Sequence, residues 1–109
     1  MQAAYEELLA FKQRRENVRI QPYLSRLEKA MQNPDSLELQ GIGKELEADS
    51  LQILNADGGQ ELYSIAGSIG AVGRLMVDKT WPLTPEEARN DLTEDYKKLT
   101  ETVKKYNLK

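Results

Sequence analysis

The stretch LYSIAGSIGAVGRLM, residues 62–76, places large apolar side chains at alternating spacings of three and four residues. These spacings bring the side chains onto one face of an α-helix, in a heptad-like seam. The seam consists of Leu62, Ile65, Ile69, Val72 and Met76. Three glycines, Gly67, Gly70 and Gly73, lie beside it. We therefore expect a helix over residues 60–79, with an apolar seam and an adjoining low surface.

This stretch does not fit either of two familiar functions, a dinucleotide-binding loop or a membrane span. A dinucleotide-binding loop needs G-x-G-x-x-G after a strand, whereas this stretch reads G-x-x-G-x-x-G inside a helical pattern. The apolar run from 62 to 77 contains Arg74 and is shorter than the roughly twenty residues of a membrane span. Two interpretations stay open for Gly67, Gly70 and Gly73: close packing against a neighbouring helix, or a groove for a partner or ligand.

Two further helices are predicted before this stretch. Residues 3–32 carry apolar side chains at helical spacing, interrupted by Pro22. We favour one long helix kinked near Pro22 over a second helix that begins near Gln21. The turn signal NPDS, residues 33–36, offers Asp35 or Ser36 as the cap of a helix over 36–54. The apolar stripe of that helix is Leu39, Ile42, Leu46 and Ile53.

The last helix has the clearest start signal. Thr84 is placed as N-cap, Pro85 at the first helical position and Glu87 at the third, which together form a capping box. The apolar positions that follow are Leu92, Tyr96, Leu99, Val103 and Tyr106. The chain is thus predicted to be all-α, a single domain over residues 1–109. Short connections between four helices favour an up-down-up-down four-helix bundle.

Composition excludes most enzyme chemistry. The 109 residues include no cysteine and no histidine, which removes thiolate and imidazole nucleophiles, bases and metal ligands. We therefore predict no catalytic residues, no metal, no cofactor and no enzyme activity. The sequence pI near 5.0 argues against nucleic acid as a partner. The start of the chain has no apolar segment typical of a secretory signal, and we expect at most a peripheral relation to membranes.

The candidate docking residues are basic side chains of the first predicted helix and the single tryptophan. The set is Lys12, Arg14, Arg15, Arg19, Arg26 and Trp81. The basic residues fit either a solvated face with ion pairs to Glu7, Glu16 and Glu28, or a patch that docks on an acidic protein surface. Trp81 fits either a cap over the end of the bundle or an exposed anchor for a partner.

Two short motifs resemble the PsbQ-type extrinsic proteins of photosystem II. They are VDKTWP, residues 77–82, and NDL, residues 90–92. Those proteins are four-helix bundles on the lumenal side of the thylakoid membrane, without catalytic activity of their own. The resemblance implies import with a cleaved targeting peptide, location in the thylakoid lumen, docking by charge, and shielding of the manganese cluster without binding it.

The sequence thus favours a structural or stabilising extrinsic subunit that docks electrostatically on a larger complex. A small regulatory or immunity-type helical protein is the alternative, although bacteriocin immunity proteins of this size are usually basic. A bundle that binds a ligand in the glycine groove is a third hypothesis.

Overall fold

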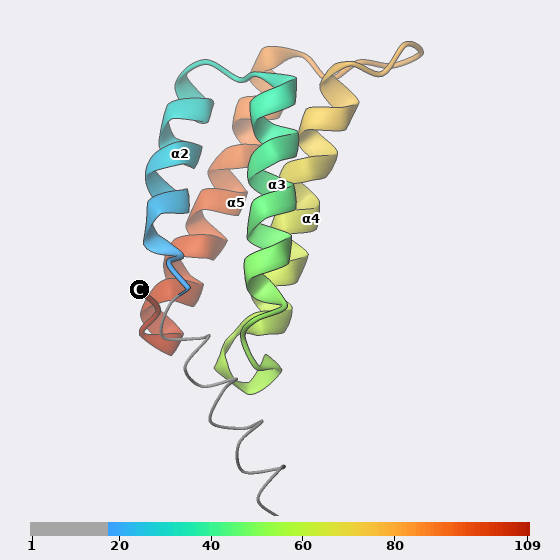
Figure 1. Ribbon diagram of the computed structural model, residues 1–109. Helices are drawn as coiled ribbons and strands as arrows, with labels where there is room; N and C mark the ends of the chain where they lie inside the picture. Colours follow the sequence, from blue (N-terminus) through green and yellow to red (C-terminus); the bar gives the residue numbers. More distant parts are fainter. Residues whose placement is uncertain (1–17) are drawn as a thin grey trace, which may run out of the picture.

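The computed structural model of the protein describes residues 18–109 (Figure 1). Four α-helices and one 3-10 turn form the regular structure of this part of the chain, which has no strand. They are α2 (Gln21–Gln32), α3 (Ser36–Ser50), η1 (Asn55–Asp57), α4 (Gly59–Met76) and α5 (Pro85–Tyr106). The prediction of an all-α protein is confirmed, and the side-by-side arrangement of the helices is that of a helical bundle.

The kink predicted near Pro22 is not confirmed. Residues 18–20 are not helical, and α2 begins at Gln21 with Pro22 in its first turn. Proline is well tolerated there because the first backbone N–H groups of a helix have no partner within it. In the described residues the chain therefore follows the second interpretation, a helix that begins near Gln21. The rest of the predicted first helix, residues 3–17, lies outside the described residues.

One hydrophobic cluster joins all four helices. From the seam quoted above, Leu62, Ile65, Ile69 and Val72 are buried, and Met76 packs against them at the edge. Each remaining helix contributes side chains with no exposed surface, among them Leu27, Leu46 and Leu92. The helical spacings in the sequence thus identified the inward faces correctly.

Hydrogen bonds between helix ends show that α2 and α5, and also α3 and α4, run antiparallel. The carbonyl of Lys109 accepts from the backbone N–H groups of Ile20 at 3.1 Å and Gln21 at 2.9 Å. At the other end of the same pair, Arg89 Nε donates to the carbonyl of Met31 at 2.8 Å. Ser36 Oγ, at the start of α3, donates to the carbonyl of Gly73 near the end of α4, at 2.6 Å.

One helix end predicted from the sequence is confirmed, and two others lie at different residues. The capping box of α5 is confirmed: Thr84 Oγ1 accepts from Glu87 N at 3.1 Å, and Glu87 Oε1 accepts from Thr84 N at 3.2 Å. However, α3 ends at Ser50 rather than near residue 54, because the chain turns there and carries Ile53 into the core. Likewise α4 ends at Met76 rather than Lys79.

Candidate docking surface

The connection between α4 and α5, residues 77–84, projects from the end of the bundle (Figure 1). Its base is closed by a backbone hydrogen bond of 2.9 Å from Leu83 N to the carbonyl of Leu75. Within it, the Asp78 carboxylate accepts from Thr80 N at 2.9 Å, which fixes a local turn. Pro82 and the capping box at Thr84 restrict the exit into α5. These constraints reduce the number of backbone conformations open to the connection.

Trp81 stands on this connection with 84% of its surface exposed. An indole that capped the bundle would be covered by the core, so the interpretation of Trp81 as a cap is wrong. Leu75 and Val77, which lie six and four residues before Trp81, are exposed as well. Sequence reasoning did not single them out, because an apolar residue at the end of a helix is ordinarily counted with the core. An aromatic side chain held out on a constrained loop is typical of a protein–protein contact.

The Arg26 side chain reaches from α2 to α3, where its guanidinium group forms ion pairs. Its guanidinium Nη2 is 2.7 Å from Glu45 Oε2 and 3.4 Å from Glu38 Oε1. Its Cζ stands 5.6 Å from the centroid of the Tyr23 ring. The hydrogen bond that Arg26 donates to the Glu45 carboxylate is the largest cause that raises the pKa of Arg26. The partners are therefore on α3, whereas Glu28, the described one of the three predicted partners, is not among them.

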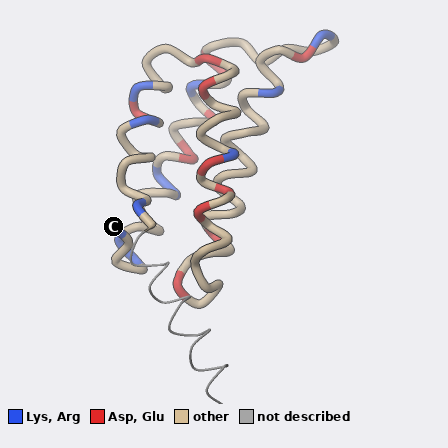
Figure 2. The backbone as a smooth tube through the Cα atoms, viewed as in Figure 1, with Lys and Arg blue, Asp and Glu red and all other residues tan. Residues whose placement is uncertain are grey.

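Arg19 is exposed at the opposite end of the molecule from Trp81, since it directly precedes the residues that bond to Lys109. Lys104 and Lys109 are exposed at the same end. Figure 2 shows basic residues near the C-terminus, whereas acidic residues concentrate along α3. We call Arg19, Lys104 and Lys109 the basic end. The sequence alone gives no reason to group these two lysines with Arg19, because they lie at the far end of the chain from it.

The structure thus does not bring Arg19, Arg26 and Trp81, the predicted docking residues that it describes, into one patch. Arg19 and Trp81 lie at opposite ends, and Arg26 is engaged between two helices. Lys12, Arg14 and Arg15 lie outside the described residues. The roles of all six residues in binding stay predictions.

The glycines of α4 have three different environments. A methyl group added to Gly73 would stand 2.8 Å from the carbonyl oxygen of Ser36, so this glycine is required for packing against α3. A methyl group on Gly67 would meet nothing within 4 Å, and one on Gly70 would meet only the end of the Arg74 side chain, at 3.3 Å. The glycine face of α4 is therefore packed at Gly73 and open at Gly67.

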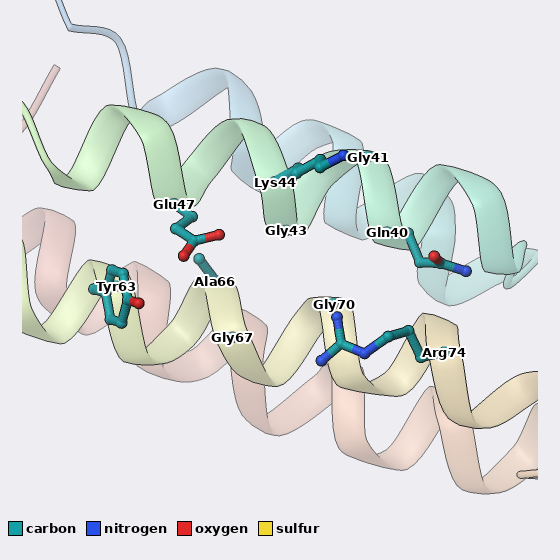
Figure 3. A pocket seen from close by; sticks show the side chains of 10 residues that line it. All are labelled: Gln40, Gly41, Gly43, Lys44, Glu47, Tyr63, Ala66, Gly67, Gly70 and Arg74. Carbon is teal, nitrogen blue, oxygen red and sulfur yellow. The ribbon is translucent and has the colours of Figure 1, made fainter.

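The open part forms a groove of about 510 Å³ between α3 and α4 (Figure 3). Its floor consists of small residues, and its walls carry one aromatic ring, two cations, one carboxylate and one amide. The lining is Gln40, Gly41, Gly43, Lys44, Glu47, Tyr63, Ala66, Gly67, Gly70 and Arg74. Glu47 points from α3 towards α4, and the Arg74 side chain runs along α4 towards Gly70 (Figure 3).

Gly43 of α3 determines how closely α3 and α4 approach. An added methyl group there would stand 2.8 Å from Gly70 N and 2.9 Å from the carbonyl oxygen of Ala66. These are backbone atoms, which cannot rotate away. The groove exists because the two helices touch at this point while the small residues on either side leave space.

Between residues 18 and 109, no group of three acidic, cysteine or histidine side chains is arranged to hold a metal ion. In the same part of the chain, no helix combines the length and apolarity needed to cross a bilayer. Comparisons with protein-family models, with curated proteins and with solved structures found no match to this chain.

Proposed function

We propose that this protein is a non-catalytic subunit that docks on a larger complex. In this proposal its principal contact is the connection over residues 77–84, which we call the Trp81 connection. The exposure of Trp81 on a loop closed at its base carries the proposal. An anchor that is already constrained loses little conformational entropy on binding. The proposal treats the domain as an up-down-up-down four-helix bundle, a scaffold that presents this loop at one end.

Charge provides a second contribution at the far end of the molecule. The basic end is exposed, and cations of this kind speed the encounter with an acidic surface. Arg26 contributes less in this proposal, because Glu38 and Glu45 already partner its guanidinium. The predicted contacts of Lys12, Arg14 and Arg15 belong to the same electrostatic contribution.

The resemblance to PsbQ-type proteins suggests one candidate for the larger complex, the lumenal side of photosystem II. The residues that carry the resemblance include the proposed anchor, since VDKTWP contains Trp81. Location in the thylakoid lumen and docking on photosystem II both stay predictions.

The proposal is tested by recovering partners on tagged chains from membranes and soluble extracts of the source organism. Trp81→Ala should lose a partner that the original chain recovers, by roughly thirtyfold, the effect of an anchor worth about 2 kcal/mol. Trp81→Phe should keep part of the binding, and Leu54→Ala serves as a matched loss of an exposed apolar side chain elsewhere. Because Trp81 is exposed, circular dichroism and thermal melting should not change.

Equal recovery by Trp81→Ala and the original chain would contradict the proposal. Recovery of photosystem II subunits would support the resemblance. A different complex, lost in the same variant, would support docking and remove photosystem II as the partner.

A further inference from the structure

The outer surface of the α3–α4 pair carries two stripes of residues with small side chains at their centres. The stripe on α3 is Leu37, Gly41, Lys44 and Ala48, continued by Leu51 directly after the helix end, and the stripe on α4 is Tyr63, Gly67 and Arg74 together with the buried Gly70. Spacings of three and four residues keep each stripe on one side of its helix. Leu37 is 79% exposed and Leu51 is 64% exposed, which is unusual for leucines of a bundle. We call these nine residues the α3–α4 face.

The fold of residues 18–109 does not explain two glycines of this face. A methyl group on Gly41 or Gly67 would meet nothing within 4 Å, so neither glycine is needed for packing inside the described chain. Glycine inside a helix costs about 1 kcal/mol relative to alanine. Both residues line the groove, where a missing side chain permits a close approach from outside.

Each stripe has a symmetric pattern. On α3, Leu37 and Leu51 each lie seven residues from Lys44, with the small residues Gly41 and Ala48 in between. On α4, Gly67 and Gly70 are central, and Tyr63 and Arg74 each lie four residues outside them. A reversed copy of such a stripe places equivalent positions opposite each other, so that Leu37 meets Leu51 and Lys44 lies opposite Lys44.

The centres of the two stripes lie at the same level of the bundle. Gly43, next to Lys44, approaches the backbone of Ala66 and Gly70, which bracket the centre of the α4 stripe. One two-fold axis across both helices therefore reverses both stripes together. Closed dimers use such an axis, because each subunit then presents the same patch to the other.

We infer that the α3–α4 face binds a second copy of this chain, with α3 against α3 and α4 against α4 in antiparallel orientation. Leu37 then faces Leu51 of the second copy, and Gly41 faces Glu47 of the second copy. The exposed Gly67 residues of the two α4 helices lie near the axis, where backbones can approach closely. The inference concerns a different surface from the Trp81 connection and does not rest on the proposed function.

Charges on the face are complementary under the same symmetry. Among residues 18–109, no ion pair involves Lys44, Glu47 or Arg74. In the dimer, Glu47 of one copy lies opposite Gly41 of the other, one helical turn from Lys44 of that copy. Two Lys44–Glu47 pairs therefore form across the axis, and they offset the repulsion between the two lysines. Arg74 faces the ring of Tyr63 of the second copy, an arrangement that favours a cation–π contact.

Sedimentation of the full chain over a wide concentration range tests the inference. The original chain should reach twice the mass of one chain. Leu51→Glu and Gly67→Leu should each keep it monomeric, the first by placing a charge opposite Leu37 and the second by separating the α4 helices. Both positions are exposed, so neither change threatens folding, which circular dichroism verifies. Trp81→Glu, the matched control outside the face, should leave the dimer intact.

A charge exchange provides the sharpest test. Lys44→Glu alone and Glu47→Lys alone each place like charges across the axis, and each should weaken the dimer by about tenfold or more. An equal mixture of the two variants should restore it, because both cross-subunit pairs are then opposite in sign.

A chain that stays monomeric at every concentration would overturn the inference. So would a dimer that is unaffected by Leu51→Glu and Gly67→Leu, or the absence of recovery in the mixture. Loss of partner binding in Trp81→Ala is measured separately, so the two proposals can fail independently.

Discussion

The two antiparallel helix pairs of this bundle are held together in opposite ways. α3 and α4 meet backbone to backbone, where Gly43 faces Gly70 and Gly73 faces Ser36. α2 and α5 are held by bulky buried side chains and by hydrogen bonds at their ends, such as Gln21 Nε2 to the carbonyl of Leu108 at 3.1 Å. We therefore expect substitutions that enlarge a side chain to destabilise the α3–α4 pair most, and substitutions that shorten a side chain to destabilise the α2–α5 pair most.

The largest effect is expected from removing atoms from α2. Leu27 is fully buried in the shared core, so Leu27→Ala should lower the free energy of unfolding by about 2–5 kcal/mol, through lost burial and a residual cavity. Urea denaturation followed by circular dichroism measures it. Leu75→Ala, the same change at an exposed position, should cost less than about 1 kcal/mol. Equal losses in the two variants would show that α2 does not depend on this burial.

A smaller effect, from an added atom, is expected on α3. Gly43→Ala should lower the free energy of unfolding by about 1–3 kcal/mol, although alanine is the better helix former, because the helices must move apart. Gly41→Ala should raise stability by up to about 1 kcal/mol, since nothing lies in the way of its methyl group. The two glycines are separated by one residue, so the comparison isolates packing from helix propensity. Stabilisation by both changes would mean that the close α3–α4 contact yields easily.

Apolar periodicity and capping chemistry predicted most of the fold. The seam of residues 62–76 is buried, and the capping box at Thr84 sets the start of α5, because both depend on residues close together in sequence. The importance of Gly43 could not be predicted in this way. Gly41 and Gly43 look alike in the sequence, and only the position of α4 makes one of them indispensable.

The candidate site was less predictable for the same reason. Sequence spacing suggests partners for Arg26 within its own helix, whereas Glu38 and Glu45 reach it from α3. The basic end arises where Arg19 and Lys109 meet, although they stand ninety residues apart in the chain. Trp81 was identified from its rarity alone, and its exposure depends on how the connection leaves the bundle.

The contact between α4 and α5, one of those that join the two helix pairs, contains a buried carboxyl group. Asp95 of α5 is 2% exposed, and the only hydrogen bond of its carboxyl group in the described part of the chain comes from Ser68 Oγ of α4, at 3.0 Å. Burial raises the pKa of Asp95 above its ordinary value of 3.8, since the bond from Ser68 and the charge of Lys98 offset it only in part. The nearby charges of Asp91 and Glu94 raise the pKa further.

The smallest of the three effects is therefore a dependence on pH. Below the pKa of the unfolded chain, Asp95 is protonated in both states and imposes no electrostatic cost on folding. As the pH rises through the higher folded-state pKa, the folded protein must bury a charge, and this residue subtracts from stability. Asp95→Asn should remove that loss, so its stability relative to the original chain should rise as the pH increases from about 4 towards neutrality. Urea denaturation at a series of pH values gives the difference curve, with Glu28→Gln as the control, since Glu28 is exposed on α2 and is not among the charges that shift the pKa of Asp95. A flat difference curve for Asp95→Asn would mean that the carboxyl group ionises without cost, and that the junction between the two helix pairs admits water.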